Sequence, residues 1–323
     1  MGRQWKRLTS GLNDGGRAMP GWPVRQLTGV LPILREETAE ATTGHVMACE
    51  RTYGLMAVTD GGMESGALGG AAAQLVAGAV QGWFEEQAAV GPLLAMPLDD
   101  AAVQALSARV AGAARQMPPM ASVTLAAAVV EYAKADQGTV SFVWAGDARG
   151  YVLTPDGLIQ ATRDDLAGEP DAYEALQQRA SLTNVVGARV PYRLHAMRAA
   201  VKLPCACLVA TAGFYAHFKT PMHVEHCLLD TLRRASSLQD WEARLRAAAS
   251  KIGPGDFSAV LMLLGFKSFG QLQEAFAARH EAIVKDYIKP LQGGSNQETQ
   301  ARALWEKYSA EAGCTEALPT KRL

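Results

Sequence analysis

The sequence predicts an α+β protein in which antiparallel strands and helices stack as a layered sandwich. Short β-rich runs follow one another between residues 122 and 161 with tight turns between them. Such turns join antiparallel strands, because parallel neighbours need long crossover connections. Two more buried strands, at residues 203–211 and 258–266, are separated by a helical stretch at 224–250. Helices first, then strands, then a helix between strands is the order of a layered α+β fold.

The individual elements are predicted from apolar runs and the turn residues between them. Residues 45–49 and 54–59 flank a polar segment and predict two strands joined by a hairpin. Residues 66–86 and 99–116 predict core-packing helices, the first from its alanine content and the second from its apolar spacing. A single antiparallel meander is predicted from four consecutive runs, at residues 123–132, 139–145, 150–153 and 158–161.

Composition divides the chain into three parts. Residues 1–22, rich in Gly, Pro and charge, predict a loose lead-in, and residues 23–267 hold the predicted sandwich. Residues 268–323 predict a C-terminal helical extension. Its first helix is indicated by Leu272, Phe276 and Ile283 at helical offsets, and a Gly-rich break at 292–296 precedes a second, charged helix. This extension is predicted either to cap the core or to bind a partner.

Composition also excludes several classes of protein. The 323 residues include 31 basic and 32 acidic ones, whereas a dedicated nucleic-acid binder would show a basic surplus. Residues 65–84 are uncharged and long enough to cross a bilayer, but Gly, Ala, Gln74 and Gln81 make them too weakly apolar. Five scattered cysteines favour reduced thiols over a disulfide framework. We therefore expect a cytoplasmic protein with neither nucleic acid nor membrane as a partner.

The most informative segment is the Asp60-Gly61 pair, where an apolar strand ends and a Gly-rich turn leads into a helix. Such a turn presents a carboxylate and an unobstructed backbone carbonyl side by side, which suits a hard cation such as Mg²⁺ or Mn²⁺. Taken alone, an Asp-Gly pair in a turn is most often only a turn.

Further motifs follow in a fixed order. They are Ser122-Val123-Thr124, Gly146-Asp147-Ala148-Arg149, Thr162-Arg163-Asp164-Asp165, Leu182-Thr183-Asn184-Val185-Val186-Gly187, Ala210-Thr211-Ala212-Gly213 and Gly255-Asp256-Phe257-Ser258. With the turn after Asp60, this series resembles the type 2C (PPM) family of metal-dependent serine/threonine phosphatases. That family carries DGxGG, GxT, GDSR, TxDH, LTxxLG, TDG and DDxTxV motifs in this order. The resemblance runs from about residue 25 to residue 266.

The resemblance implies a four-layer α-β-β-α sandwich with two central antiparallel sheets and two metal ions at one edge between them. The implied chemistry is attack of a metal-bridging hydroxide on a phosphoserine or phosphothreonine. Asp60 matches the bridging aspartate and Gly61 the carbonyl ligand, while Asp147 matches an aspartate that helps bind an additional ion. Upstream, Arg35 is carried over as the phosphate-binding arginine and Glu37 as a metal ligand.

Two departures from the family pattern decide the functional prediction. Ala212 stands at one metal-ligating aspartate position and Gly255 at another, and neither supplies a side-chain oxygen. Asp256, at the neighbouring non-ligand position, remains as a replacement metal ligand. Because Mg²⁺ accepts one or two protein carboxylates when waters complete its shell, there is room for one weakly held Mg²⁺ or Mn²⁺, or for none.

Three functions follow from these departures. The first is a pseudophosphatase that binds a phosphoprotein, a protein kinase or another regulatory partner. The second is an active Mn²⁺- or Mg²⁺-dependent phosphatase whose site is rebuilt with Glu64, Asp164 or Asp256. The third is an assembly subunit whose C-terminal helices carry the interaction.

A zinc site is a competing interpretation for the histidine-rich segment that contains His217, His223, His226 and Cys227. Their spacing matches no standard zinc motif, so this site is disfavoured. Cys205 and Cys207 alternate along a buried strand and are predicted to lie in the core.

Overall fold

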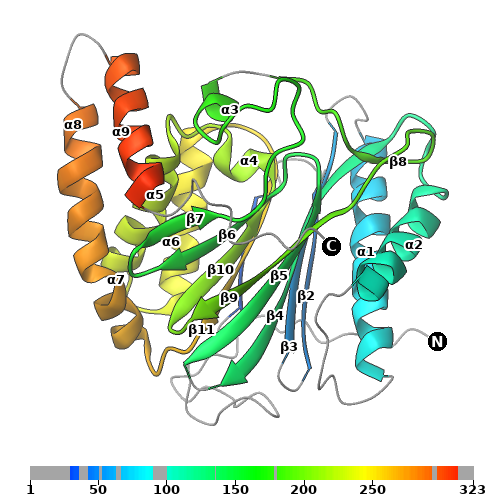
Figure 1. Cartoon of the computed structure of the whole chain (residues 1–323), viewed down its shortest axis with the longest axis horizontal. Coiled ribbons are helices and arrows are strands. Elements are labelled where there is room, and N and C mark those ends of the chain that lie inside the picture. The colour runs from blue at the N-terminus through cyan, green and yellow to red at the C-terminus, as the bar shows by residue number, and fades with distance from the viewer. Residues whose placement is uncertain are drawn as a thin grey trace.

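The computed structural model describes residues 30–35, 43–50, 53–62, 67–89, 100–134, 136–177, 180–292 and 297–311. Its centre is a pair of antiparallel sheets (Figure 1). The first sheet has the order β1 (Val30–Arg35), β11 (Phe257–Leu264), β10 (Cys205–Ala210), β6 (Arg149–Thr154) and β7 (Gly157–Gln160). The second has the order β2 (Thr43–Glu50), β3 (Tyr53–Gly61), β4 (Ser122–Lys134), β5 (Gln137–Ala145) and β9 (His195–Lys202), and β8 (Val186–Gly187) pairs with β4.

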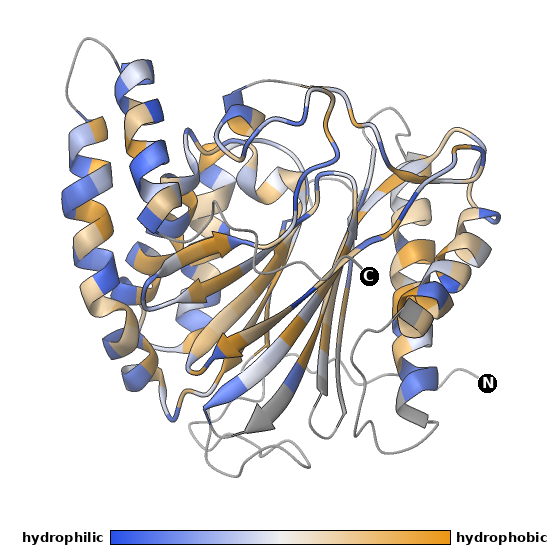
Figure 2. Cartoon of the chain, in the orientation of Figure 1, coloured by the Kyte–Doolittle hydropathy of each residue, from blue (hydrophilic) through white to orange (hydrophobic). Residues whose placement is uncertain are grey.

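Helices cover the outer face of each sheet and complete four layers, as predicted. The second sheet is covered by α1 (Ala67–Ala89) and α2 (Asp100–Ala114). The first sheet is covered by α4 (Ala212–Tyr215), α5 (Pro221–Arg234), α6 (Leu238–Ile252) and the C-terminal helices, and the short α3 (Glu174–Gln177) lies at one end. Figure 2 shows the apolar residues concentrated on the strands and on the helix faces turned toward them.

Alternation along the strands explains why three separate layers of apolar side chains form. In β10, Cys205, Cys207 and Val209 point between the two sheets, whereas Ala206 and Leu208 point toward the helices. Side chains of a strand alternate between its two faces, so a strand buried on both faces is apolar throughout. The prediction that both cysteines lie in the core is confirmed, and both are fully buried.

The predicted single meander is wrong. The first two of its strands pair as β4–β5 in the second sheet, and the last two pair as β6–β7 in the first sheet. The chain crosses from one sheet to the other at the turn Gly146–Ala148, where Gly146 has φ +90°. Tight turns indicated antiparallel neighbours, but they carry no information about a strand that changes sheets.

The described part of the C-terminal extension, residues 268–292 and 297–311, is largely helical and packs on the first sheet's helical layer. It contains α7 (Phe269–Ile283), a π-helical turn (Val284–Ile288), α8 (Lys289–Leu291) and α9 (Gln297–Glu311). The apolar cluster that contains the buried side chains of α5 and α6 also contains Leu272, Phe276 and Ile283, which predicted the first helix of the extension. The predicted lead-in at residues 1–22 lies outside the described residues.

None of the helices in the described part of the chain is long and apolar enough to cross a membrane.

Candidate metal centre

One end of the sandwich collects the predicted site residues. Asp60 is the penultimate residue of β3, Asp147 lies in the turn that crosses between the sheets, and Asp256 immediately precedes β11. Ala212 is the first residue of α4, directly after β10. These four positions come from distant parts of the sequence, and only the pairing of the strands brings them together.

One hydrogen bond joins the two sheets at this end, and a second joins neighbouring strands of the first sheet. The Ser258 hydroxyl donates to Thr43 Oγ1 at 2.7 Å, and Thr43 pairs with Asp60 in the register of β2 and β3. The Ser258 amide donates to Thr211 Oγ1 at 3.0 Å, which holds the end of β10 beside the start of β11. Thr43, Thr211 and Ser258 are buried, so these bonds are shielded from water.

Gly61 stands where the chain leaves β3 and meets α1. A Cβ atom at this position would lie 2.2 Å from the carbonyl oxygen of Gly69, so only glycine permits the close approach. Gly61 pairs with Val123 of β4, which fixes the backbone beside Asp60. Glu64, the acid that could rebuild the site, lies outside the described residues.

Asp147 is held by contacts on both sides of its turn. The Tyr215 hydroxyl of α4 donates to the Asp147 carbonyl oxygen. The Arg149 guanidinium lies 3.9 Å above the ring of Tyr215, and it forms a buried ion pair with Asp164 through Nη2 and Oδ2 at 2.6 Å. Since Asp164 is engaged in this pair, it is poorly placed to serve as a replacement metal ligand.

The two departures from the family pattern lie at the same end of the sandwich. Gly255 has φ +95°, and a Cβ atom there would meet nothing within 4 Å. A side chain at this position would therefore enter open space. Because residue 255 is a glycine, no carboxylate occupies that space. Ala212 is half-buried at the start of α4 and offers no side-chain oxygen either.

The negative charges of two neighbouring carboxylates act on Asp60. Burial, reinforced by the charges of Asp147 and Asp256, raises the pKa of Asp60 to about 7. Burial and the charge of Asp164 raise the pKa of Asp147 to about 6, although Arg149 opposes this effect. Asp60 and Asp147 thus share a site with a shortage of positive charge, which a divalent cation would relieve. The residues fit one cation, but with Ala212 and Gly255 in place they do not fit a binuclear centre.

This repulsion predicts that Asp60→Asn stabilises the metal-free protein at pH 8. The folded-state pKa of about 7 exceeds the ordinary value of 3.8, so the wild-type free energy of unfolding falls as the pH rises from about 4 to about 7. One pKa unit corresponds to about 1.4 kcal/mol, and after allowing for solvent screening we expect a gain of about 1 to 2 kcal/mol for Asp60→Asn at pH 8. The gain should vanish near pH 3. Urea unfolding in chelator at both pH values measures it, and a variant less stable at pH 8 would refute the charge argument.

Arg35 ends β1 at the same end of the sandwich. Its Nη1 donates to the carbonyl oxygens of Ser250 at 3.1 Å and Gly253 at 2.6 Å, so part of the guanidinium anchors the end of α6. Its role as a phosphate-binding residue stays a prediction. Glu37 lies outside the described residues.

A hydrogen-bond network around Asp165 was not predicted from the sequence. Asp165 accepts from the Gly146 amide at 2.8 Å and from Asn184 Nδ2 at 2.7 Å, and it lies 2.9 Å from His195 Nε2. Although burial acts to raise it, these three bonds hold the pKa of Asp165 below its usual value. The network fixes the turn that carries Asp147. No motif in the sequence indicated His195, because it lies 30 residues after Asp165 in a segment for which no strand was predicted.

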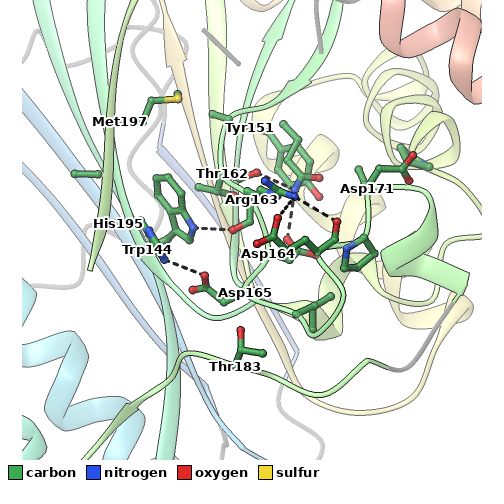
Figure 3. A pocket seen from close by; sticks show the side chains of 18 of the residues that line it. Trp144, Tyr151, Thr162, Arg163, Asp164, Asp165, Asp171, Thr183, His195 and Met197 are labelled. Carbon is green, nitrogen blue, oxygen red and sulfur yellow. Dashed lines mark hydrogen bonds and ion pairs between the residues drawn. The ribbon is translucent and has the colours of Figure 1, made fainter. Parts of the chain in front are cut away.

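A cavity of about 750 Å³ adjoins this network. Figure 3 shows Trp144 and His195 on one wall and Asp164 and Thr162 on another. The Trp144 ring stacks on His195 with centroids 5.2 Å apart, and its Nε1 donates to the Arg163 carbonyl oxygen at 2.8 Å. The cavity therefore has a rigid wall that joins the Asp165 network.

The four residues of the disfavoured zinc site do not form a ligand set. His223 Nδ1 lies 2.8 Å from Thr220 Oγ1, within the cap of α5. Cys227 is buried, and burial raises the pKa of its thiol to about 12, so it is a neutral thiol rather than a ligating thiolate. Among the described residues, the group that could hold a metal ion with His226 consists of Asp230 and His280 instead.

Comparison with known proteins identifies the fold. No protein-family model and no curated protein matches the sequence. The serine/threonine phosphatase PstP/Ppp of Mycobacterium tuberculosis has a TM-score of 0.54 and 22% identity, covering 73% of this chain and 98% of that chain. The catalytic domain of PstP in complex with 2 manganese ions has a TM-score of 0.52 and 20% identity, covering 73% of this chain and 97% of that chain. The serine/threonine phosphatase Stp1 from Staphylococcus aureus has a TM-score of 0.55 and 15% identity, covering 77% of this chain and 98% of that chain. Together with the two sheets and the ordered motifs at their ends, these similarities show that the chain has the fold of the type 2C (PPM) serine/threonine phosphatases.

Proposed function

We propose that the chain is a catalytically impaired phosphatase-like protein that holds one divalent cation weakly and binds a phosphorylated protein or a protein kinase. One observation carries the proposal: Asp60, Asp147 and Asp256 lie at one end of the sandwich, while Ala212 and Gly255 supply no side-chain oxygen there. A single ion with few carboxylates is weakly held, because Mg²⁺ and Mn²⁺ rely on charged oxygen ligands.

The residues that would hold the cation are Asp60, Asp147 and Asp256, with the Gly61 carbonyl as a neutral ligand. When bound, a divalent ion neutralises carboxylates and phosphoryl oxygens. Asp60 and Asp147 would then stay ionised at neutral pH, and the Asp165 network would keep Asp147 oriented. A phosphate group of the partner would complete the ion's shell, so that phosphate and cation stabilise each other's binding.

The cavity beside the Asp165 network would accommodate a side chain of the partner next to its phosphorylated residue. It is larger than a phosphate group requires, and Trp144 and Met197 give it apolar surface beside Arg163 and Asp165. A side chain that neighbours the phosphorylated residue would pack there. The partner's sequence preference would thus come from this cavity, while its phosphate would be recognised at the sheet ends.

Calorimetric titration with Mn²⁺ and Mg²⁺, beside phosphopeptide binding and hydrolysis, tests the proposal. We expect dissociation constants for the metal in the millimolar range, phosphopeptide binding that Asp60→Ala weakens at least about tenfold, and hydrolysis no faster than that of Asp60→Ala. Tight binding of two ions, with turnover lost in Asp60→Ala, would instead show an active phosphatase with replacement ligands such as Asp256. Phosphopeptide binding that Asp60→Ala leaves unchanged would refute recognition at this site.

A further inference from the structure

A second group of potential metal ligands lies outside the sheet ends, between two helices of the outer layer. His226 and Asp230 lie one turn apart on α5, and His280 faces them from α7 of the C-terminal extension. The three ligand atoms lie within 4.8 Å of one another. The helices α5 and α7 pack against each other and are neighbours in Figure 1. We call these three residues the α5–α7 cluster.

The buried imidazole of His280 has a ring nitrogen without a hydrogen bond. The residue is 8% exposed, and its Nε2 has no hydrogen-bond partner among the described residues. The nearest carboxylate oxygen, Asp230 Oδ1, is 3.6 Å away, which is too far for a hydrogen bond. A buried polar atom left unsatisfied costs about 1 to 3 kcal/mol, so this nitrogen points to a binding partner that the protein side chains do not provide.

The donor set suits a borderline transition metal. Burial lowers the pKa of both His226 and His280, so both rings are neutral near pH 7 and each has a lone pair to donate. The rings stack with centroids 6.0 Å apart and an angle of 20° between their planes. Asp230 Oδ2 forms an ion pair with Arg234 Nη2 at 3.0 Å, whereas Asp230 Oδ1 faces His280. Two imidazole nitrogens and one carboxylate oxygen are a common ligand set for Zn²⁺.

We propose that His226, Asp230 and His280 bind one Zn²⁺ ion that fastens α7 of the C-terminal extension to α5. Tetrahedral zinc with bonds of about 2.0 to 2.1 Å holds its ligand atoms about 3.4 Å apart. Because the three ligand atoms already lie within 4.8 Å of one another, movements of about 1 Å by the side chains bring them to that spacing. A water molecule takes the fourth position. The neighbouring charges of Arg233 and Arg234 oppose the ion, so the site is weaker than a four-ligand structural zinc site.

This site is chemically distinct from the one at the sheet ends. Carboxylate and carbonyl oxygens at Asp60 and Gly61 select Mg²⁺ or Mn²⁺, whereas imidazole nitrogens favour zinc. The two sites therefore respond to different metals and to different substitutions. A proton is the rival occupant of the α5–α7 cluster, because a protonated His280 could donate to Asp230 without any metal.

Zinc titration of the full chain, stripped of metal with chelator, tests the proposal. We expect one Zn²⁺ per chain by calorimetry, with Co²⁺ giving the visible absorption of a tetrahedral site. At a hundredfold excess of zinc over its Kd, the folding equilibrium should shift about 100-fold toward the native state. His226→Gln, Asp230→Asn and His280→Gln should each weaken zinc binding at least about tenfold.

Two control variants make the test specific. His223→Gln changes a histidine of the same helix whose ring is engaged by Thr220, and it should bind zinc like the wild type. Asp60→Asn should also bind zinc like the wild type. Because substitution of the buried His280 also disturbs core packing, the half-buried His226 carries the decisive measurement. No zinc binding by the wild type, or unchanged binding by His226→Gln, would overturn the proposal, as would zinc binding that is lost in Asp60→Asn.

Discussion

Replacing Arg149 with Met is expected to lower the free energy of unfolding by about 3 to 5 kcal/mol. The side chain is 1% exposed, and its Nε and Nη2 donate to both oxygens of Asp164, which is 4% exposed. The substitution leaves the Asp164 carboxylate buried without its cation. It also removes the guanidinium from the face of Tyr215. Since Tyr215 bonds to the Asp147 carbonyl oxygen, the turn at the candidate metal centre should loosen as well.

A neighbouring arginine offers the matched control for this experiment. Arg163 pairs with Glu169 at 2.9 Å, but both side chains are more than half exposed, at 64% and 77%. Exposed ion pairs contribute about 0 to 1 kcal/mol, so Arg163→Met should change the unfolding free energy by less than about 1 kcal/mol. Urea unfolding of both variants, followed by tryptophan fluorescence, measures the difference. Equal losses in the two variants would mean that burial of the Arg149–Asp164 pair does not determine its contribution.

Local sequence patterns predicted the strands of this protein better than they predicted the sheets. Apolar runs and the turn residues between them placed β2 and β3 as a hairpin, and the structure confirms it with register pairs from Thr43–Asp60 to Glu50–Tyr53. The same signals joined β5 to β6, which belong to different sheets. A turn of three residues at Gly146 is compatible both with a hairpin inside one sheet and with a crossing from one sheet to the other. The choice is made by packing of β6 against β10, and that partner comes more than 50 residues later.

The candidate metal centre could be predicted in part, because its residues stand at strand ends within recognisable motifs. Asp60, Asp147 and Asp256 each follow or precede an apolar run, and the charges of Asp147 and Asp256 act on Asp60 in the folded chain. Their role as metal ligands stays a prediction. The supporting contacts could not be predicted. His195 reaches Asp165, and Tyr215 reaches Asp147, across 30 and 68 residues of sequence. Nothing in the local pattern around a histidine or a tyrosine says which distant carboxylate or carbonyl it will meet.

The strongest gain is expected from restoring the two missing carboxylates. The double variant Ala212→Asp, Gly255→Asp should bind Mn²⁺ at least about 100-fold more tightly than the wild type, because the site gains two charged oxygen ligands and hard cations depend on them. Open space beside Gly255 accommodates the new side chain. Phosphopeptide hydrolysis above that of the wild type would follow if a second ion is bound, since paired ions stabilise both oxygens of an in-line displacement. Calorimetry in Mn²⁺ and a phosphate-release assay measure the two effects.

The backbone at residue 255 makes one control indispensable. With φ at +95°, any residue other than glycine is strained there, at a cost of order 1 to 3 kcal/mol. Gly255→Ala carries the same strain without a carboxylate, and Ala212→Asn adds side-chain volume without the charge. Both control variants should bind Mn²⁺ no better than the wild type. If the double variant binds Mn²⁺ no better than these controls, the absence of carboxylates at positions 212 and 255 is not what weakens the site. The shape of the sheet ends must then be what excludes a second ion.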